Sequence, residues 1–299
     1  MDDHALYRVA LPGGPRLALG PPAAEPERLL PPELTLDRLL TGSAGQFWRD
    51  LDQAPTAPLT APARILAPIE SQEVWAAGVT YAPSRDARKL ESPRYGSVYD
   101  AVFSAERPEL FYKSAGTRVR GPGEDIAIRS DSSWNVPEPE LVLVVTSRCE
   151  VAALTIGNDA SSRSIEGANP LYLPQAKIYD GSCAVGPCLI RPPQAISLGI
   201  GLEIRRGPET IFQATTNTAQ IVRPLAELAR WLGRALTLPA GAFLLTGTGI
   251  VPPAEFSLQG GDSVVISIEG IGVLANGVCR IECGDLPADE AWNAGRREP

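Results

Sequence analysis

The chain contains 299 residues, with a formal charge of −8 at pH 7 and a sequence pI near 4.9. Its length suits one or two domains, and its acidic balance argues against a nucleic-acid partner, which would select for clustered lysine and arginine. No run of about 18 apolar residues indicates a membrane span, and the acidic start lacks the apolar core of a secretion signal, so we expect a cytoplasmic protein with no membrane partner.

The first 66 residues predict a small N-terminal domain. Residues 7–11 resemble a strand that ends at Pro12-Gly13-Gly14, and apolar side chains recur at helical spacing between Leu36 and Leu51. Proline clusters interrupt the pattern between these two segments and again at 55–66, where we expect a linker. A second, larger domain then covers residues 67–299.

From residue 65 onward the sequence changes to short apolar runs that are typical of β-strands. The runs with this pattern are residues 73–77, 126–128, 141–145, 263–268 and 278–281. Helical spacing returns only at 85–90 and 224–236. The larger domain is therefore predicted to be α+β and rich in β-structure.

Residues 270–275 loosely match a dinucleotide-binding turn, with glycines at 270 and 272. That motif requires a helix after it. Here Asn276-Gly277 follows, a pair typical of hairpin turns, and then the strand-like residues 278–281. We therefore predict a β-hairpin with its turn at Asn276-Gly277, and no nucleotide cofactor.

Histidine is almost absent, which excludes several chemistries. His4 is the only one, and it lies on a terminus that we expect to be mobile. Catalytic triads and most zinc or iron sites use an internal imidazole. The five cysteines form no Cys-x-x-Cys pair and predict reduced thiols. Any catalysis must then use carboxylates, lysine, hydroxyls or an oxygen-liganded cation such as Mg²⁺.

Two glutamates precede the most apolar strand. Glu138 and Glu140 lie in Pro137-Glu138-Pro139-Glu140, immediately before residues 141–145. Side chains two residues apart on a strand share a face, and two carboxylates repel unless a cation or proton lies between them. The pair is a candidate for half of a metal site, although a solvated strand face is the simpler interpretation of this motif alone.

Three further segments could carry chemistry. Asp159 lies in Gly157-Asn158-Asp159-Ala160-Ser161-Ser162-Arg163, either at a ligand site or in a simple turn. Lys177 stands among apolar residues, either as a buried acid–base group with a lowered pKa or as a surface lysine. The third segment, Thr246-Gly247-Thr248, either allows close approach of a ligand to the backbone or forms a β-turn.

These segments, in this order, resemble the fumarylacetoacetate hydrolase family over roughly residues 70–281. The resemblance implies that family's mixed β-roll or barrel fold with a small N-terminal domain. It also implies a divalent cation bound by Glu138, Glu140 and Asp159. Mg²⁺ is expected, and Mn²⁺ or Ca²⁺ would also accept these oxygen ligands.

The lid segment departs from the hydrolases of the family. Many of them carry Gly-x-Asn-Tyr-x-x-His-x-x-Glu, whose His and Glu activate water. Here Ser84 replaces the His and Ala87 replaces the Glu. Hydrolysis of a carbon–carbon bond by that route is therefore not expected.

Several motifs look instead like the 2-keto-3-deoxy-D-arabinonate dehydratase branch of the family. These motifs lie at residues 99–102, 107–113, 129–134, 137–140 and 166–175. The resemblance implies dehydration of a 2-keto-3-deoxy-D-pentonate, derived from arabinonate or xylonate, to 2,5-dioxopentanoate.

The resemblance also suggests roles for individual residues. Glu124 and Lys177 match the acid–base pair of that branch, with the two roles unassigned between them. Further candidates, for binding the substrate, are Tyr81, Ser84, Arg85 and Thr248. A homodimer or higher homo-oligomer is implied as well.

Three alternatives stay open from the sequence. Hydrolysis of acylpyruvates or diketo acids would need a water-activating group other than histidine. Decarboxylation of oxaloacetate would need only stabilisation of an enolate. A non-catalytic protein could keep the cation site for binding alone.

Overall fold

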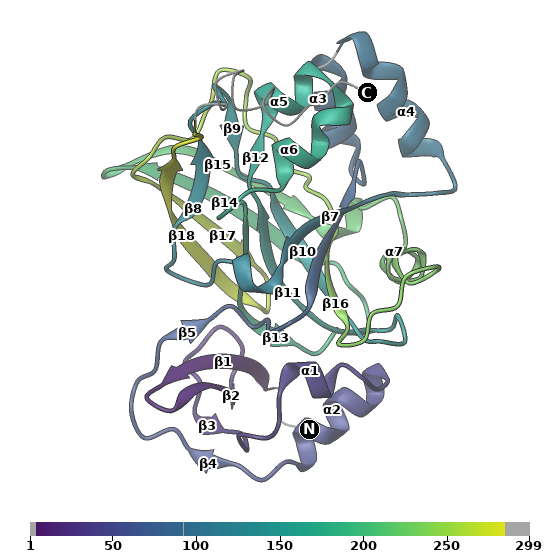
Figure 1. The fold of residues 1–299 in the computed structure, drawn as a ribbon. Coiled ribbons are helices and arrows are strands. Elements are labelled where there is room, and N and C mark those ends of the chain that lie inside the picture. Colours follow the sequence, from purple (N-terminus) through teal and green to yellow (C-terminus); the bar gives the residue numbers. More distant parts are fainter. Residues whose placement is uncertain (1–3, 92, 285–299) are drawn as a thin grey trace, which may run out of the picture.

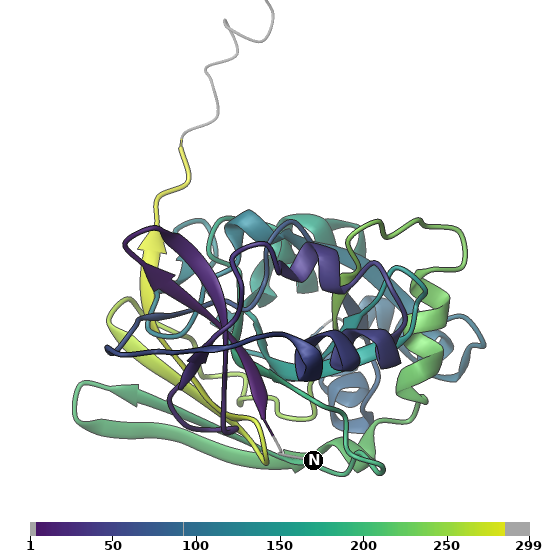
Figure 2. The same cartoon turned by 90° about the horizontal axis from the view of Figure 1, so that it is seen from below.

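The structure is a computed structural model that describes residues 4–91 and 93–284. Residues 5–66 form the unit drawn in purple and dark blue at the bottom of Figure 1. Seen from below, its strands lie beside its two helices, in front of the rest of the chain (Figure 2). Its elements are β1 (Ala5–Leu11), β2 (Gly14–Gly20), β3 (Arg28–Leu29), α1 (Leu36–Leu39), α2 (Ala44–Gln53), β4 (Ala57–Pro58) and β5 (Ile65–Leu66).

Helix α2 shows why this unit packs on the rest of the protein. Ser43 caps its N-terminus, because the Ser43 hydroxyl accepts a hydrogen bond from the Gln46 N–H at 3.2 Å. Phe47, Trp48 and Leu51 fall on one face and are buried. The indole N–H of Trp48 donates to the Ala152 carbonyl at 2.6 Å, which fixes the helix against the large sheet.

That large sheet has the strand order β4-β3-β2-β1-β13-β11-β10-β16-β6-β7, with β5 paired to β1. It continues from the N-terminal unit into the rest of the chain through the pairing of β1 with β13. Its further strands are β6 (Glu73–Gly78), β7 (Glu109–Ala115), β10 (Pro139–Val145), β11 (Val151–Asp159), β13 (Cys183–Ile190) and β16 (Ala242–Leu245).

A second sheet packs against the first and has the order β15-β14-β17-β18-β8. Its strands are β8 (Ile126–Arg129), β14 (Gly199–Arg206), β15 (Glu209–Asn217), β17 (Asp262–Ile268) and β18 (Gly272–Ile281). A third, short sheet pairs β9 (Asn135–Val136) with β12 (Ser161–Ser162).

Strand β10 is buried on both faces, which explains its unbroken apolar sequence. Leu141 and Leu143 belong to a core shared with the second sheet, which contributes residues such as Ile266. Val142 and Val144 belong to a second core, which contains Phe47 of α2. Alternate residues of a strand point to opposite faces, so a strand between two cores has no polar side.

The remaining helices gather around one end of the sheets, where Figure 1 places α3, α4, α5 and α6 together. They are α3 (Ala82–Glu91), α4 (Gly96–Ser104), α5 (Arg163–Ala168) and α6 (Leu173–Lys177), while α7 (Leu225–Leu232) lies apart from them. Short 3-10 turns cover Pro93–Tyr95, Gly116–Arg118, Pro170–Tyr172 and Thr218–Gln220. No helix in residues 4–91 and 93–284 combines the length and apolar character that crossing a membrane requires.

The predicted α+β, β-rich architecture is confirmed, but three local expectations were wrong. The hairpin exists, with its turn between Ile268 and Gly272; Asn276 lies inside β18, where its buried amide donates to the Gly121 and Glu124 carbonyls at 2.9 and 2.7 Å. The expected linker contains β4 and β5, which pair with β3 and β1. His4 packs on the N-terminal unit, 3.3 Å from Asp52.

Candidate functional site

The three carboxylates predicted from the sequence meet in one place. Residues Glu138, Glu140 and Asp159 are 4%, 1% and 1% exposed, and one oxygen of each lies within 4.8 Å of the others. The register of two strands explains the meeting. Glu140 on β10 pairs with Gly157 on β11, and the Asp159 N–H donates to the Glu138 carbonyl at 3.0 Å. The ends of an antiparallel pair therefore carry all three side chains.

The turn after β16 completes this group. The Gly247 N–H donates to the Glu140 carboxylate at 2.5 Å. Gly247 has φ of 87°, and a Cβ there would collide with the Thr80 hydroxyl, so the turn requires glycine. Thr80 in turn donates to the Thr246 carbonyl at 2.5 Å. The Thr-Gly-Thr segment thus orients a carboxylate with its backbone.

The charges of the triad fit a divalent cation. Burial raises the pKa of Glu140 well above its ordinary value, and the neighbouring Asp159 and Glu138 raise it further. Three buried carboxylates offer only hard oxygen donors, which suit Mg²⁺, Mn²⁺ or Ca²⁺. A cation among them would offset the repulsion that raises this pKa, so the donor set supports a divalent metal.

Lys177 lies against two of these carboxylates. Its ammonium donates to Glu138 at 2.6 Å and to Asp159 at 2.8 Å. Burial by itself would lower the pKa of Lys177, but the charges of Asp159 and Glu138 outweigh it and raise the pKa above its ordinary value. The expectation of a lowered lysine pKa was therefore wrong, because the lysine is buried together with its counter-charges.

Strand β7 adds three residues to which the sequence analysis gave no role. Glu109 and Phe111 lie two residues apart and so share one face. Lys113 lies at an irregularity of the strand and reaches the same site. Glu109 and Phe111 line the pocket. Lys113 is fully buried, and its ammonium lies 2.5 Å from Asp159. The alternation of charged and aromatic residues at 109, 111 and 113 is the sequence signal that could have identified this face.

The Glu109 carboxyl lines the pocket and has a shifted pKa. Burial raises its pKa, and the nearby Glu166 raises it further, while Arg88 and Lys177 act in the opposite direction with a smaller effect. A carboxyl in such surroundings can carry a proton closer to neutral pH than an exposed one.

A ring of buried ion pairs forms another wall. Arg88 lies 3.2 Å from Glu138 and 3.2 Å from Glu166. Arg163 lies 3.1 Å from Glu138 and 3.6 Å from Glu166. The sequence analysis missed these three residues. Arg163 and Glu166 lie three residues apart on α5, and the packing of α3 on α5 brings Arg88 to them.

The structure separates the predicted substrate-binding residues into two groups. Ser84 and Thr248 line the pocket. Tyr81 does not line the pocket. Burial raises the pKa of Tyr81, and the nearby Glu140 carboxylate raises it further. Arg85 points away from it, to Asp86 at 2.7 Å and over the Phe103 ring. Arg85 is one position along α3 from the inward-facing Ser84, which turns it outward.

Glu124 lies outside the pocket, so its predicted catalytic role is not supported by its position. Its carboxylate accepts from the Gly121 N–H at 2.8 Å and lies 3.1 Å from Arg64. Its side chain is 35% exposed. The loop at 121–125 packs on Asn276 of β18 and against Leu66 and Ala67. None of its residues lines the pocket. Glu109, by contrast, lines the pocket beside the triad.

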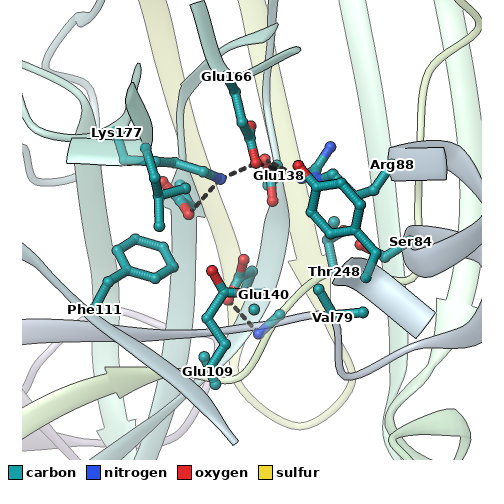
Figure 3. Close-up of a pocket in the computed structure, with 16 residues that line it drawn as sticks. Val79, Ser84, Arg88, Glu109, Phe111, Glu138, Glu140, Glu166, Lys177 and Thr248 are labelled. Carbon is teal, nitrogen blue, oxygen red and sulfur yellow. Dashed lines mark hydrogen bonds and ion pairs between the residues drawn. The ribbon is translucent and has the colours of Figure 1, made fainter. Parts of the chain in front are cut away.

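The pocket is narrow, with a cavity volume of about 20 Å³. Figure 3 shows Lys177, Glu166, Glu138 and Arg88 along its upper side and Glu140 and Glu109 below. Phe111 and Leu173 supply apolar surface. None of its lining residues is a histidine or a cysteine.

Sequence comparison agrees with this geometry. The family pattern described as "Fumarylacetoacetate (FAA) hydrolase C-terminal" matches residues 74–279, which include the triad, Lys177 and the Thr-Gly-Thr turn. The chain belongs to the fumarylacetoacetate hydrolase family. Within this family it is 44% identical, over 250 residues, to "Probable 2-keto-3-deoxyxylonate dehydratase" of Haloferax volcanii, covering 83% of this chain and 84% of that protein. It is 41% identical, over 217 residues, to "2-dehydro-3-deoxy-D-arabinonate dehydratase" of Saccharolobus solfataricus, covering 71% and 73%.

Solved structures of family members are similar as well. "2-keto-3-deoxy-D-arabinonate dehydratase apo form" superposes with a TM-score of 0.80 and 32% identity, covering 93% of this chain and 99% of that one. The same enzyme "complexed with magnesium and 2,5-dioxopentanoate" gives a TM-score of 0.79 and 31% identity, covering 93% and 100%. A fumarylacetoacetate hydrolase fold is thereby established for this chain.

Proposed function

We propose that this protein is a Mg²⁺-dependent hydro-lyase that converts 2-keto-3-deoxy-D-pentonate to 2,5-dioxopentanoate. The observation that carries the proposal is a buried carboxylate triad facing Lys177 and Glu109 in a pocket whose lining contains no histidine. The two relatives at 44% and 41% identity bear dehydratase names, which supports the same reaction class.

Glu138, Glu140 and Asp159 would hold the cation. When bound there, a divalent cation supplies a Lewis acid that polarises the C2 carbonyl of a 2-keto acid. Mn²⁺ or Ca²⁺ would fit the same oxygen donors. The family neighbour that contains magnesium and 2,5-dioxopentanoate supports Mg²⁺.

Lys177 and Glu109 would move the protons. The reaction removes a proton from C3 and releases the C4 hydroxyl as water, which needs one base and one acid. A proton shift from C5 then turns the remaining hydroxymethyl carbon into the aldehyde. Glu109, with its raised pKa, can donate a proton and later accept one. In the proposal Glu109 takes the place of Glu124, and Lys177 keeps its predicted role.

Ser84 and Thr248 would contact the substrate hydroxyls, since both line the pocket. Tyr81 would lie next to Glu140, outside the pocket lining, and would not contact the substrate directly. Arg85 has no part in binding in this proposal. Phe111 and Leu173 would exclude water from the carbon chain.

The overall charge of the site suits a monoanionic substrate. In the described part of the chain, the pocket and its ion-pair partners contribute the carboxylates of Glu109, Glu138, Glu140, Asp159 and Glu166. They also contribute the cations Arg88, Lys113, Arg163 and Lys177. With every group ionised, one negative charge remains. A divalent cation would reverse that sign, which favours binding of one carboxylate anion.

The direct test is turnover by the purified protein with Mg²⁺. We expect 2-keto-3-deoxy-D-pentonate to yield 2,5-dioxopentanoate, and Glu140→Ala to abolish the reaction while circular dichroism shows an intact fold. Hydrolysis of an acylpyruvate or decarboxylation of oxaloacetate, without loss of water from the pentonate, would replace the dehydratase by one of the alternative activities. Full activity of Glu140→Ala would reject the cation site.

We further propose that the protein is cytoplasmic and a homodimer or higher homo-oligomer. The five free thiols support a cytoplasmic location. The family resemblance supports the oligomer. Light scattering of the purified protein measures the assembly directly, and a monomer at micromolar concentration would refute it.

A further inference from the structure

Helix α3 covers the pocket with a face that is polar. Over residues 82–90, its buried side chains are Ser84 and Arg88, which are 4% and 5% exposed. They lie four residues apart, so they point to the same side, and both line the pocket. The large apolar side chain of α3, Leu90, is 82% exposed. The helix therefore lacks the apolar stripe that normally fixes a helix to a protein.

Polar contacts take the place of that stripe. The Arg88 guanidinium reaches Glu138 and Glu166, each at 3.2 Å. On its outer side, α3 has exposed ion pairs, such as Lys89 with Asp100 at 2.7 Å, and pairs of this kind contribute little. Charge-assisted hydrogen bonds between buried groups contribute more. The inner anchor of α3 is thus the side chain of Arg88.

This anchor ends on a proposed cation ligand. One oxygen of Glu138 receives Arg88, Arg163, Lys177 and the Ser161 hydroxyl, at 3.2, 3.1, 2.6 and 2.6 Å. The position of α3 and the charge of the cation site therefore depend on the same carboxylate.

We propose that Arg88 is a positioning residue that holds helix α3, and with it Ser84, over the pocket by bridging the cation ligand Glu138 to Glu166. The inference rests on the proposed function, since it assigns Ser84 to the keto-acid substrate. It goes further by making one side chain act on the helix, the cation and the substrate together.

The positive charge of Arg88 determines the direction in which its removal should change cation and substrate binding. Removing this positive charge makes the site more negative, which strengthens the attraction for a divalent cation and weakens it for a keto-acid anion. A residue that merely supported the fold would weaken both kinds of binding when removed. Opposite changes in the two affinities therefore distinguish positioning from general structural support.

The experiment compares Arg88→Gln, Arg88→Lys and the control Lys89→Gln. Lys89→Gln removes the same charge from the outer face of the same helix, where the lysine side chain is 41% exposed. Three measurements are made on each variant. They are the Kd of Mn²⁺ by electron paramagnetic resonance, the steady-state kinetics (KM and kcat) with 2-keto-3-deoxy-D-pentonate, and hydrogen–deuterium exchange of peptides from α3 and β10.

For Arg88→Gln we expect Mn²⁺ binding about three- to tenfold tighter and a KM about ten- to a hundredfold higher. Exchange in α3 should become faster, with β10 unchanged. Arg88→Lys keeps the charge but lacks the planar fork, so we expect Mn²⁺ affinity within about twofold of the wild type, with faster α3 exchange and a raised KM. Lys89→Gln should match the wild type in all three.

Weaker Mn²⁺ binding by Arg88→Gln together with faster exchange in β10 would overturn the proposal, because Arg88 would then be a general structural support. Unchanged α3 exchange in both Arg88 variants would overturn it as well. If Arg88→Gln does not fold, Arg88→Lys decides by its α3 exchange. If the wild type fails to turn over the pentonate, the proposed function falls, while the Mn²⁺ and exchange measurements still decide the role of Arg88.

Discussion

The ammonium of Lys113 lies 2.5 Å from Oδ1 of Asp159, and neither side chain exposes more than 2% of its surface. The same ammonium donates to the carbonyls of Lys177 and Ala160 at 2.5 and 3.1 Å. Although burial would raise the pKa of Asp159, Lys113 and Lys177 outweigh it and lower that pKa. Lys113 therefore keeps one member of the triad ionised and also fixes the backbone of Lys177.

Replacing Lys113 by Met should destabilise the protein strongly. The change leaves a buried carboxylate without one of its counter-charges, and breaking a buried pair in this way costs about 3–5 kcal/mol. Urea unfolding in the presence of a chelator measures the free energy of unfolding directly. Lys89→Met is the matched control, because its partner Asp100 is exposed and such surface pairs contribute about 1 kcal/mol or less. Equal losses for both variants would contradict the importance of burial.

Glu109→Gln should separate stability from activity. A carboxyl whose pKa is raised in the folded protein stabilises the fold at low pH, and that contribution is lost as the pH rises through the raised value. Glutamine does not titrate, so the stability of the variant does not fall in this way as the pH rises. We expect the melting temperature of the variant, relative to wild type, to rise between about pH 4 and neutral pH in chelator, while turnover is lost. A constant difference across this range would show that Glu109 has an ordinary pKa.

Gly78→Ala tests how closely the Glu109 carboxyl is positioned. A Cβ at residue 78 would collide with one oxygen of Glu109, at the far end of a flexible side chain. The carboxyl can swing away at little cost to the fold, but its place in the pocket is lost. We expect kcat to fall about tenfold or more, with a melting temperature close to that of wild type. Gly13→Ala is the control, since nothing lies within 4 Å of the added Cβ. A large loss of stability in Gly78→Ala would show instead that the backbone had moved.

The sequence was informative where local pattern and burial coincide. The apolar run at 141–145 predicted a strand, and β10 is one because two cores cover its faces. Glu138 and Glu140 could be paired from their spacing, but their meeting with Asp159 depends on the register of β10 and β11. No local pattern indicates such a register.

Other features depend on contacts between distant residues. The Asn276-Gly277 pair suggests a turn, yet the Asn276 side chain is buried and bonded to the loop at 121–124. The ring of Arg88, Arg163 and Glu166 forms only when α3 meets α5. Glu109 could have been predicted more readily, because charged and aromatic residues alternate at positions 109, 111 and 113 of the sequence.

Glu124→Gln should leave catalysis close to wild type, in contrast to Glu109→Gln. The Glu124 side chain is 35% exposed and pairs with Arg64 on a surface loop, so its substitution changes no contact in the pocket. The lost ion pair should cost about 1 kcal/mol or less. Steady-state kinetics of the two variants, measured side by side at saturating Mg²⁺, provide the comparison. A hundredfold loss of kcat in Glu124→Gln with full activity in Glu109→Gln would require the loop at 121–125 to reach the pocket during turnover, and would restore Glu124 as the acid–base group.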